Sequence, residues 1–222
     1  MLPILRPPKT DLEELARIQE SVAEEVDRSD RIQKLETIAG CDVSFARGNR
    51  AYAACAVLDY RSLRVLKYRV EKVKVNFPYI PTFLAFRELP PMLSVVKGMD
   101  ADVYMVGAQG VAHPRRAGLA SHLGVVIDRP TVGVAKSRLC GRAVPPPDER
   151  GAYSLLVDDG ETIGAVVVTK AGARPVYVSI GHKVSLERAI RITLQTSKEH
   201  RLPEPIMVAH RLATDAMRKT KF

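Results

Sequence analysis

The sequence predicts an α/β protein built on a mixed five-stranded sheet that is flanked by helices. Three strand-like segments separated by short turns come first, and two helix-then-strand units follow them. A meander pairs its strands antiparallel, whereas a crossover through a helix places the next strand parallel to an earlier one. With 222 residues and 46% hydrophobic content, the chain is long enough to bury one full core.

The first expected element is a helix over residues 10–27. Thr10 and Glu13 have the spacing of a capping box, which marks a helix start. Apolar residues then recur at helical spacing, at positions 12, 15, 18, 22 and 26. Glutamates fill the opposite face, which we interpret as the solvated side of a packed helix; a helix that binds a partner is the alternative.

The antiparallel meander is expected next. Its three strands are predicted at residues 35–45, 51–59 and 63–73. Between the first two, Arg47-Gly-Asn-Arg50 is typical of a hairpin turn that needs positive φ angles.

Two crossover units follow an irregular, proline-fixed loop at residues 76–81. Their expected elements are a helix at 82–98, a strand at 103–106, a helix at 114–126 and a strand at 130–135. Right-handed crossovers of this kind complete the five-stranded sheet.

Further elements are expected after this core. The stretch 142–150 is proline-rich and predicts an exposed loop. Strands are then expected at 154–157, 162–169 and 176–180, and helices at 185–195 and 205–217. We interpret residues 1–222 as a single domain, with a core at about 35–140 and C-terminal β and helical additions over 151–217.

Composition indicates the broad class of protein. The net charge of +9 suits a polyanionic partner, although many basic proteins merely have solvated surfaces. Cys41, Cys55 and Cys140 form no zinc-binding pattern, and a sparse, odd count favours a reducing compartment. No apolar run is long enough to span a membrane or to serve as a signal peptide. A cytoplasmic protein without a membrane partner is expected, and a monomer is the simplest assumption.

The densest cluster of polar side chains runs from Gln109 to Gly124, directly after the strand at 103–106. It contains two histidines and two adjacent arginines, His113, Arg115, Arg116 and His122. Active sites of open α/β sheets collect where a strand ends and its loop begins. Arginine forks suit phosphate oxygens, and a helix starting near Pro114 would add its amides to an anion site. The alternative is an ordinary helix start with two solvated arginines.

Two carboxylates stand out from their surroundings. Asp42 lies inside an apolar strand, where a buried carboxylate needs a partner or a metal ion. Taken alone, it is either a paired structural residue or a ligand. Glu88 is expected on the helix after the proline loop, where an ion pair with Arg87 or an exposed helix charge is the alternative to a ligand.

Three blocks of sequence resemble the endonuclease V family. They are Val111-Ala-His-Pro-Arg-Arg-Ala-Gly-Leu-Ala-Ser-His-Leu-Gly124, Gly40-Cys-Asp-Val-Ser44, and Phe77-Pro-Tyr-Ile-Pro81 with the following Leu84-Ala-Phe-Arg-Glu88. The resemblance implies a ribonuclease-H-like fold and a DNA-repair nuclease that acts on deaminated bases such as hypoxanthine (inosine). It also implies cleavage at the second phosphodiester 3′ of the lesion, leaving a 3′-hydroxyl.

The same resemblance implies a set of catalytic residues and a metal. Asp42, Glu88 and His210 are the implied ligands of Mg²⁺, with Mn²⁺ as a substitute, and Lys136 is the implied contact to the scissile phosphate. A phosphodiester needs a cation to neutralise developing charge and to activate water, so this assignment agrees with the chemistry. Taken alone, His210 is an ordinary helix histidine and Lys136 an exposed strand-end lysine.

Residues for substrate recognition are also implied. Tyr79, held rigid by its neighbours Pro78, Ile80 and Pro81, is the wedge that fills the gap left by a flipped base; the alternative is a tyrosine folded onto the core. Other implied nucleic-acid contacts are His113, Arg115, Arg116, Gly118, His122, Lys136 and Ser137. The implied pocket for the flipped base is formed by Thr82, Ala108, Gly118 and Leu119.

Position 107 departs from the family pattern. The family has an Asp-Gly pair where this chain has Gly107-Ala108, so its second metal-binding aspartate is missing. Asp102 lies five residues earlier, roughly 16 Å away at strand rise, and cannot replace it; Gln109 or His113 could supply a neutral ligand. Two hypotheses remain: a divalent-metal-dependent endonuclease, and a weakened or inactive module that binds lesions in nucleic acid. Under both hypotheses, the expected partner of the protein is DNA with deaminated bases, with RNA as the alternative. No nucleotide cofactor is expected.

Overall fold

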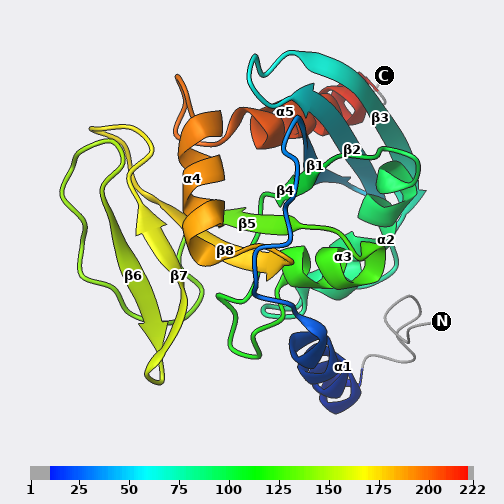
Figure 1. Ribbon diagram of the computed structural model, residues 1–222. Coiled ribbons are helices and arrows are strands. Elements are labelled where there is room, and N and C mark those ends of the chain that lie inside the picture. Colours follow the sequence, from blue (N-terminus) through cyan, green and yellow to red (C-terminus); the bar gives the residue numbers. More distant parts are fainter. Residues whose placement is uncertain (1–10, 220–222) are drawn as a thin grey trace.

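A single eight-stranded sheet runs through the computed structural model, which describes residues 11–219, and helices cover both of its faces (Figure 1). The strand order is β3-β2-β1-β4-β5-β8-β7-β6. The strands are β1 (Thr37–Ala46), β2 (Arg50–Asp59), β3 (Val65–Lys74), β4 (Val103–Val106), β5 (Thr131–Ala135), β6 (Tyr153–Asp158), β7 (Glu161–Val167) and β8 (Val176–His182). The helices are α1 (Leu12–Glu25), α2 (Leu84–Val96), α3 (Leu119–Ile127), α4 (Leu186–Thr196) and α5 (Glu204–Lys219).

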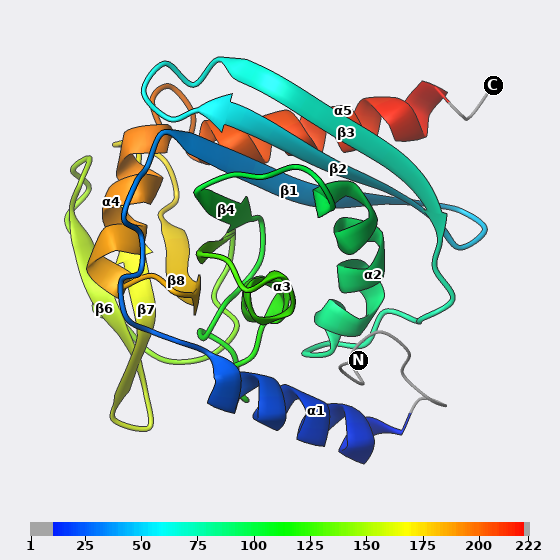
Figure 2. The same ribbon diagram turned by 45° about the vertical axis from the view of Figure 1, so that its right-hand side comes forward.

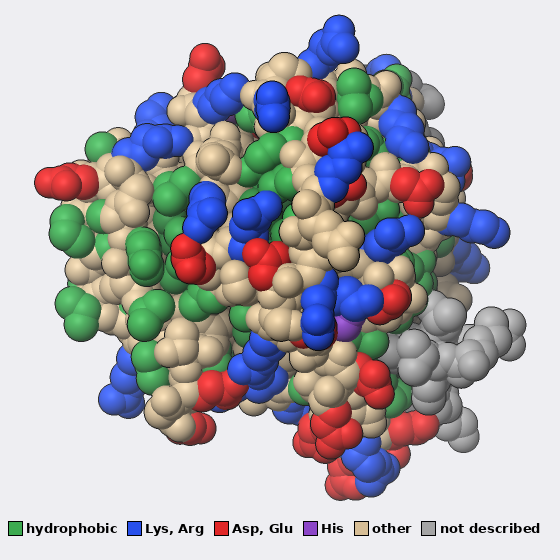
Figure 3. Space-filling view, viewed as in Figure 1, with side chains coloured by type: hydrophobic (Ala, Val, Ile, Leu, Met, Phe, Trp, Pro, Cys, Tyr) green, Lys and Arg blue, Asp and Glu red, His purple; other side chains and the backbone are tan. Residues whose placement is uncertain are grey.

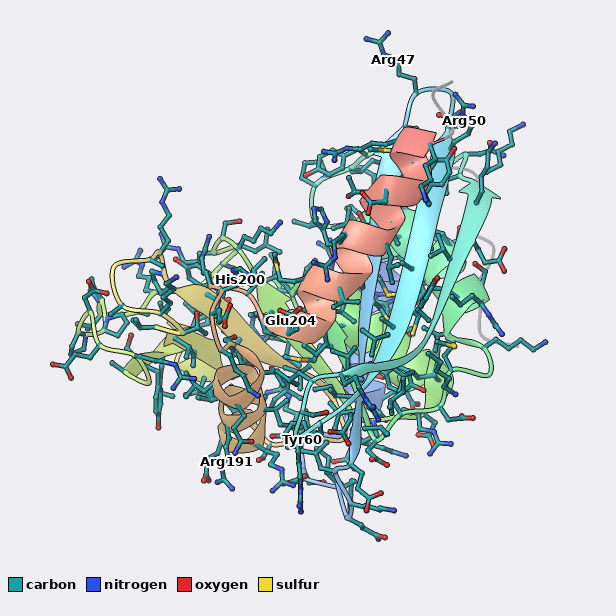
Figure 4. The ribbon with its side chains drawn as sticks, turned by 90° about the horizontal axis from the view of Figure 1, so that it is seen from above. Arg47, Arg50, Tyr60, Arg191, His200 and Glu204 are labelled. Atoms are coloured by element: carbon teal, nitrogen blue, oxygen red, sulfur yellow. The ribbon has the colours of Figure 1, made fainter. Side chains whose placement is uncertain are left out.

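The predicted meander is confirmed. β1 pairs with β2 and β2 with β3, both antiparallel. The turn between β1 and β2 contains Gly48 at φ 76° and Asn49 at φ 57°, two consecutive positive values as a tight hairpin turn requires. Arg47 and Arg50 project at the tip of this hairpin (Figure 4).

The two crossover units place β4 and β5 beside the meander. β4 pairs parallel with β1, and β5 pairs parallel with β4. Both strands are buried along their whole length, as is usual for parallel strands that are covered on both faces. The expected core of five strands is therefore present in the order β3-β2-β1-β4-β5.

The sheet does not end at five strands. β8 pairs antiparallel with β5, and β7 and β6 extend the same sheet further. The sequence predicts these strands but not their pairing, because nothing local in a strand specifies which distant edge it joins. The C-terminal segments therefore continue the core sheet, and residues 1–222 as one domain stays a prediction.

The helices form two layers. Apolar residues of α1, α2 and α3 meet one face of the sheet in a cluster that includes Leu15, Phe86 and Leu123. Residues of α4 and α5, among them Ile192 and Ile206, form a second cluster on the other face. Figure 2 shows α1, α2 and α3 on one side of β1 and α5 on the other. None of the helices in the described range 11–219 is long and apolar enough to cross a membrane.

The start of α1 differs from the prediction. The helix is capped by Asp11, whose side chain accepts hydrogen bonds from the backbone of Glu13 and Glu14; Thr10 lies outside the described residues. The expected acidic outer face is present, and Figure 3 shows acidic side chains gathered at the lower end of the molecule, over α1. Gln19 is fully buried on the apolar stripe of this helix, between Ile18 and Val22.

The start of α3 was also predicted wrongly. The helix begins at Leu119 rather than near Pro114, because Arg116 adopts a left-handed φ of 55° and Gly118 is extended. The backbone of Gly118 instead donates to Gly110 O, which ties the turn to the preceding loop. Helix amides therefore do not point at the polar cluster around His113, and an anion site at a helix start near Pro114 is not formed.

Candidate active site

Asp42 and Gly107 are neighbours at the point where the parallel pairing of β1 and β4 ends. The register of β1 and β4 ends at Cys41 opposite Val106; Asp42 is the next residue of β1, and Gly107 directly follows the end of β4. A Cβ added to Gly107 would lie 3.6 Å from Asp42 Oδ1 and 3.4 Å from Ile206 Cγ2. Any side chain at position 107 would therefore stand beside the Asp42 carboxylate, and glycine leaves that space open.

His210 reaches the same carboxylate from α5. Its Nδ1 atom lies 2.8 Å from Asp42 Oδ2. The approach depends on Gly40, because a Cβ at that position would lie 1.9 Å from Pro205 O. The first turn of α5 therefore lies directly on β1, and His210 follows further along the same helix; Figure 4 shows α5 lying along the strands, with Glu204 at its start.

Glu88 joins the group from α2. Burial and, after it, the negative charge of Asp42 together raise the pKa of Glu88 to about 8. The two carboxyl groups are therefore close enough to repel each other. Arg87 does not pair with Glu88: its guanidinium donates to Phe77 O at 2.5 Å and stacks 4.2 Å from the centroid of the Phe45 ring.

Lys136 completes the charged group. Burial raises the pKa of Asp42, and the hydrogen bond with His210 and then the positive charge of Lys136 oppose this rise. Lys136 is exposed at the end of β5. The four residues that the sequence singled out for catalysis, Asp42, Glu88, Lys136 and His210, are thus gathered at one end of the short strand β4.

A cavity of about 330 Å³ opens beside this group. All four predicted pocket residues, Thr82, Ala108, Gly118 and Leu119, line it. Gly118 must be glycine here, since a Cβ would lie 2.3 Å from Gln109 O. Gly107, the residue beside Asp42, lines the cavity as well.

The rim of the cavity carries residues from three loops. Tyr79 is 69% exposed, so the tyrosine is not folded onto the core. Pro81, Ile80, Lys136 and Ser137 line the cavity as well. Residues that the sequence analysis missed are Gln19, Leu84, Ala85, Ala135, Arg138 and Leu139. Of these, only Gln19 carried a detectable signal, as a polar residue on the apolar stripe of its helix.

The wall around Thr82 is held by hydrogen bonds. His113 is almost fully buried, and its Nε2 lies 2.8 Å from Thr82 O. Burial lowers the pKa of His113 to about 4, so the ring is neutral at pH 7. Gln109 donates to Ser137 O at 2.9 Å. Both side chains are therefore engaged in the wall of the cavity, and within residues 11–219 no hydrogen bond joins either of them to Asp42.

Arg116 and His122 make contacts inside the protein, and their predicted contacts to nucleic acid stay predictions. The Arg116 guanidinium binds Asp158 at 2.9 Å and Glu161 at 2.5 Å, and only 17% of its side chain is exposed. Its planar fork is therefore already occupied by carboxylates of the β6–β7 hairpin. His122 is completely buried edge-on against Phe86, with 5.5 Å between ring centroids, and cannot touch a ligand in this conformation.

Comparison with known proteins decides the family. The Endonuclease V family model matches residues 20–211. The Endonuclease V of Methanothrix thermoacetophila is 47% identical over 210 residues, which cover 94% of this chain and 93% of that protein. The chain belongs to the Endonuclease V family. Its enzyme class is therefore that of the deoxyribonuclease V-type endonucleases.

Solved structures of the Endonuclease V family share the fold. That of Streptomyces avermitilis superposes with a TM-score of 0.90 at 34% identity, over 97% of this chain and 96% of that one. That of Ciona intestinalis, in complex with a 24mer DNA containing an inosine followed by a ribo-adenosine, gives a TM-score of 0.83 at 27% identity, over 94% and 98%. The expected ribonuclease-H-like α/β fold is confirmed.

Membership of the Endonuclease V family implies a divalent metal cofactor. Among residues 11–219, no three His, Cys, Asp or Glu side chains are grouped closely enough to hold a metal ion by themselves. Two repelling carboxylates nevertheless fit a hard cation, because Mg²⁺ often binds through one or two carboxylates and takes waters and substrate phosphates as its other ligands. Asp42 and Glu88 would hold it, with His210 beside Asp42.

Proposed function

We propose that the protein is a divalent-metal-dependent endonuclease for DNA that carries deaminated bases, with inosine as its principal lesion. The observation that carries the proposal is the position of Gly107, which lines the cavity and lies beside the Asp42 carboxylate. A flipped base in the cavity would leave its backbone at the rim, next to Lys136 and the two carboxylates. The Ciona intestinalis relative in complex with inosine-containing DNA supports this choice of substrate.

Each residue has a chemical task in this proposal. Asp42 and Glu88 hold a divalent cation, Mg²⁺ or Mn²⁺, which when bound would neutralise phosphate charge and activate a water molecule. His210 orients the Asp42 carboxylate through the 2.8 Å contact. Lys136 presents a positive charge to the phosphodiester, and exposed Tyr79 fills the gap left by the flipped base.

The position of the cut follows from the family resemblance. We propose hydrolysis of the second phosphodiester 3′ of the lesion, in a DNA-repair role. A monomer acting in the cytoplasm remains the simplest expectation. RNA that contains inosine is the alternative substrate. The cleavage assay described below compares DNA with RNA and decides between the two substrates.

A second candidate is a lesion-binding protein with weak or no cleavage. The observation that favours it is Gly107, which leaves the space beside Asp42 without a third carboxylate. Such a protein would keep the cavity and Tyr79, and would lose metal affinity and the correct placement of water.

The test is cleavage and binding of defined strands. Purified protein is incubated with single- and double-stranded DNA and RNA containing one inosine, in Mg²⁺ or Mn²⁺, with adenine-containing strands as controls. Asp42→Asn serves as the control for contaminating nucleases. Nicking near inosine that needs both metal and Asp42 supports the endonuclease. Inosine-selective binding without nicking supports the second candidate, and the absence of any preference for inosine rules out both.

A further inference from the structure

Thr82 occupies a backbone position that normally requires glycine. Phe83 N donates to Ile80 O at 3.1 Å, which closes a four-residue turn with Pro81 second and Thr82 third. Thr82 has a φ of 66°. A turn with proline second and positive φ third is of type II, where glycine or asparagine is the usual third residue. A β-branched residue with positive φ is strained, and such strain persists only where the surroundings enforce it.

Three side chains enforce this conformation. The carbonyl oxygen of Thr82 accepts hydrogen bonds from Gln19 Nε2 and from His113 Nε2, both at 2.8 Å. The hydroxyl oxygen Oγ1 accepts one from the Arg115 guanidinium at 3.0 Å. Arg115 Nε donates to Gln19 Oε1 at 2.6 Å, so that Gln19, Arg115 and Thr82 form a closed ring of hydrogen bonds.

The protonation state of His113 fits this ring. The backbone N–H of Arg115 donates to His113 Nδ1, so Nδ1 carries no proton and Nε2 is the donor to the Thr82 carbonyl. Gln19 is completely buried and His113 is 3% exposed. Arg115 also stacks on the ring of Phe83, 4.4 Å from its centroid. The side chains that hold the turn are therefore themselves fixed.

The ring connects parts of the chain that are distant in sequence. Gln19 comes from α1, Thr82 from the loop that carries Tyr79, and Arg115 from the turn before α3. Residues 76–82 contain no helix or strand, so the turn at Thr82 is what fixes the end of the Tyr79 loop. Gln19, Tyr79 and Thr82 all line the cavity.

We propose that Gln19 and Arg115 are positioning residues, which act through Thr82 to hold the Tyr79 loop at the rim of the cavity. The inference rests on the proposed function, since Tyr79 and the cavity are assigned there to lesion recognition. A loop that is already ordered loses less entropy when DNA binds, and the gain is greatest for the substrate that uses the loop. Loss of the ring therefore weakens binding to inosine-containing DNA more than binding to intact DNA.

The first experiment measures the loop without DNA. The chain contains no tryptophan, so Tyr79→Trp introduces a single reporter into the loop. In this background, Thr82→Val removes the hydroxyl and keeps the branched shape, whereas Thr82→Ser keeps the hydroxyl. Gln19→Glu removes the donor to the Thr82 carbonyl and keeps the acceptor for Arg115. We expect lower tryptophan anisotropy in the Val and Glu variants and an unchanged value in the Ser variant. Equal anisotropy in all of them overturns the inference.

The second experiment measures recognition with Tyr79 in place. Dissociation constants are compared for inosine-containing and adenine-containing duplexes, with thermal melting as a check on folding. The Thr82→Val and Gln19→Glu variants should each lose about tenfold in preference for inosine, which is the effect of one hydrogen bond to a charged or buried group. Thr82→Ser, which keeps the hydroxyl, should keep the preference of the unaltered chain. A preference within about twofold of that of the unaltered chain in every variant contradicts the inference. If the unaltered chain has no preference, the proposed function fails, and the anisotropy still decides whether the ring holds the loop.

Discussion

Placing a carboxylate at position 107 is the most direct test of how complete the catalytic group is. A Cβ at this position makes ordinary contacts, at 3.4 Å to Ile206 and 3.6 Å to Asp42, and the backbone of Gly107 lacks the positive φ that would exclude other residues. Gly107→Asp should therefore be accommodated without rearrangement, and its carboxylate would point into the space beside Asp42.

The expected magnitude follows from the distance. Two negative charges about 4 Å apart repel by ~4 kcal/mol at an effective dielectric constant of about 20. Partial protonation and side-chain movement reduce this, so without metal we expect Gly107→Asp to lower the free energy of unfolding by about 1–3 kcal/mol. A divalent cation between the carboxylates turns repulsion into attraction, and the dissociation constant for Mg²⁺ should fall by at least about tenfold, or ~1.4 kcal/mol.

The assay is calorimetric titration with Mg²⁺ and Mn²⁺, together with denaturant unfolding in EDTA and the rate of nicking beside inosine. Gly107→Asn is the matched control, because it has the same shape without the charge. Gly107→Asp should bind metal more tightly and nick faster than both the unaltered chain and the asparagine variant. Equal metal affinity for the Asp and Asn variants would refute the reasoning. So would Mg²⁺-dependent nicking by the unaltered chain at the rate of the Asp variant.

Three further predictions concern single side chains. Tyr79→Ala should weaken binding to inosine-containing DNA more than binding to intact DNA in a fluorescence titration, and equal losses would contradict the wedge. Arg116→Ala should lower stability by about 1–2 kcal/mol through the loss of two partly buried ion pairs, while affinity for DNA changes less than about twofold; a large, uniform, salt-dependent loss of affinity would mean that the guanidinium binds phosphate after all. For His122, burial lowers the pKa to about 3, and within residues 11–219 neither ring nitrogen has a hydrogen-bond partner. Below about pH 6.5 the unfolded chain therefore binds a proton at this residue that the folded chain does not bind until about pH 3. Stability should thus fall as the pH drops from about 6.5 towards 3, and His122→Leu should flatten this decline without loss of stability at pH 7, as measured by urea unfolding across pH.

Much of the fold could be predicted because its determinants are local. The hairpin at Gly48 and Asn49 needs only two residues that tolerate positive φ, and β4 needs only its apolar run. The prediction failed where a non-helical backbone conformation inside the expected helix was overlooked. α3 starts at Leu119 because the left-handed Arg116 and the extended Gly118 interrupt the helix, and the sequence alone does not show that Arg116 adopts this conformation.

The sequence by itself determined which residue types the chain offers for chemistry: a carboxylate inside an apolar strand, another on the helix after the proline loop, a glycine where the family resemblance leads us to expect an aspartate, and a tyrosine fixed between prolines. Only the tertiary structure decided which of them meet. Asp42 and His210 are 168 positions apart, Arg115 and Gln19 are 96 apart, and Arg116 and Glu161 are 45 apart. Whether an arginine is free for phosphate or a histidine is buried depends on partners brought together by packing, and the periodicity of one segment carries no information about the side chains of another.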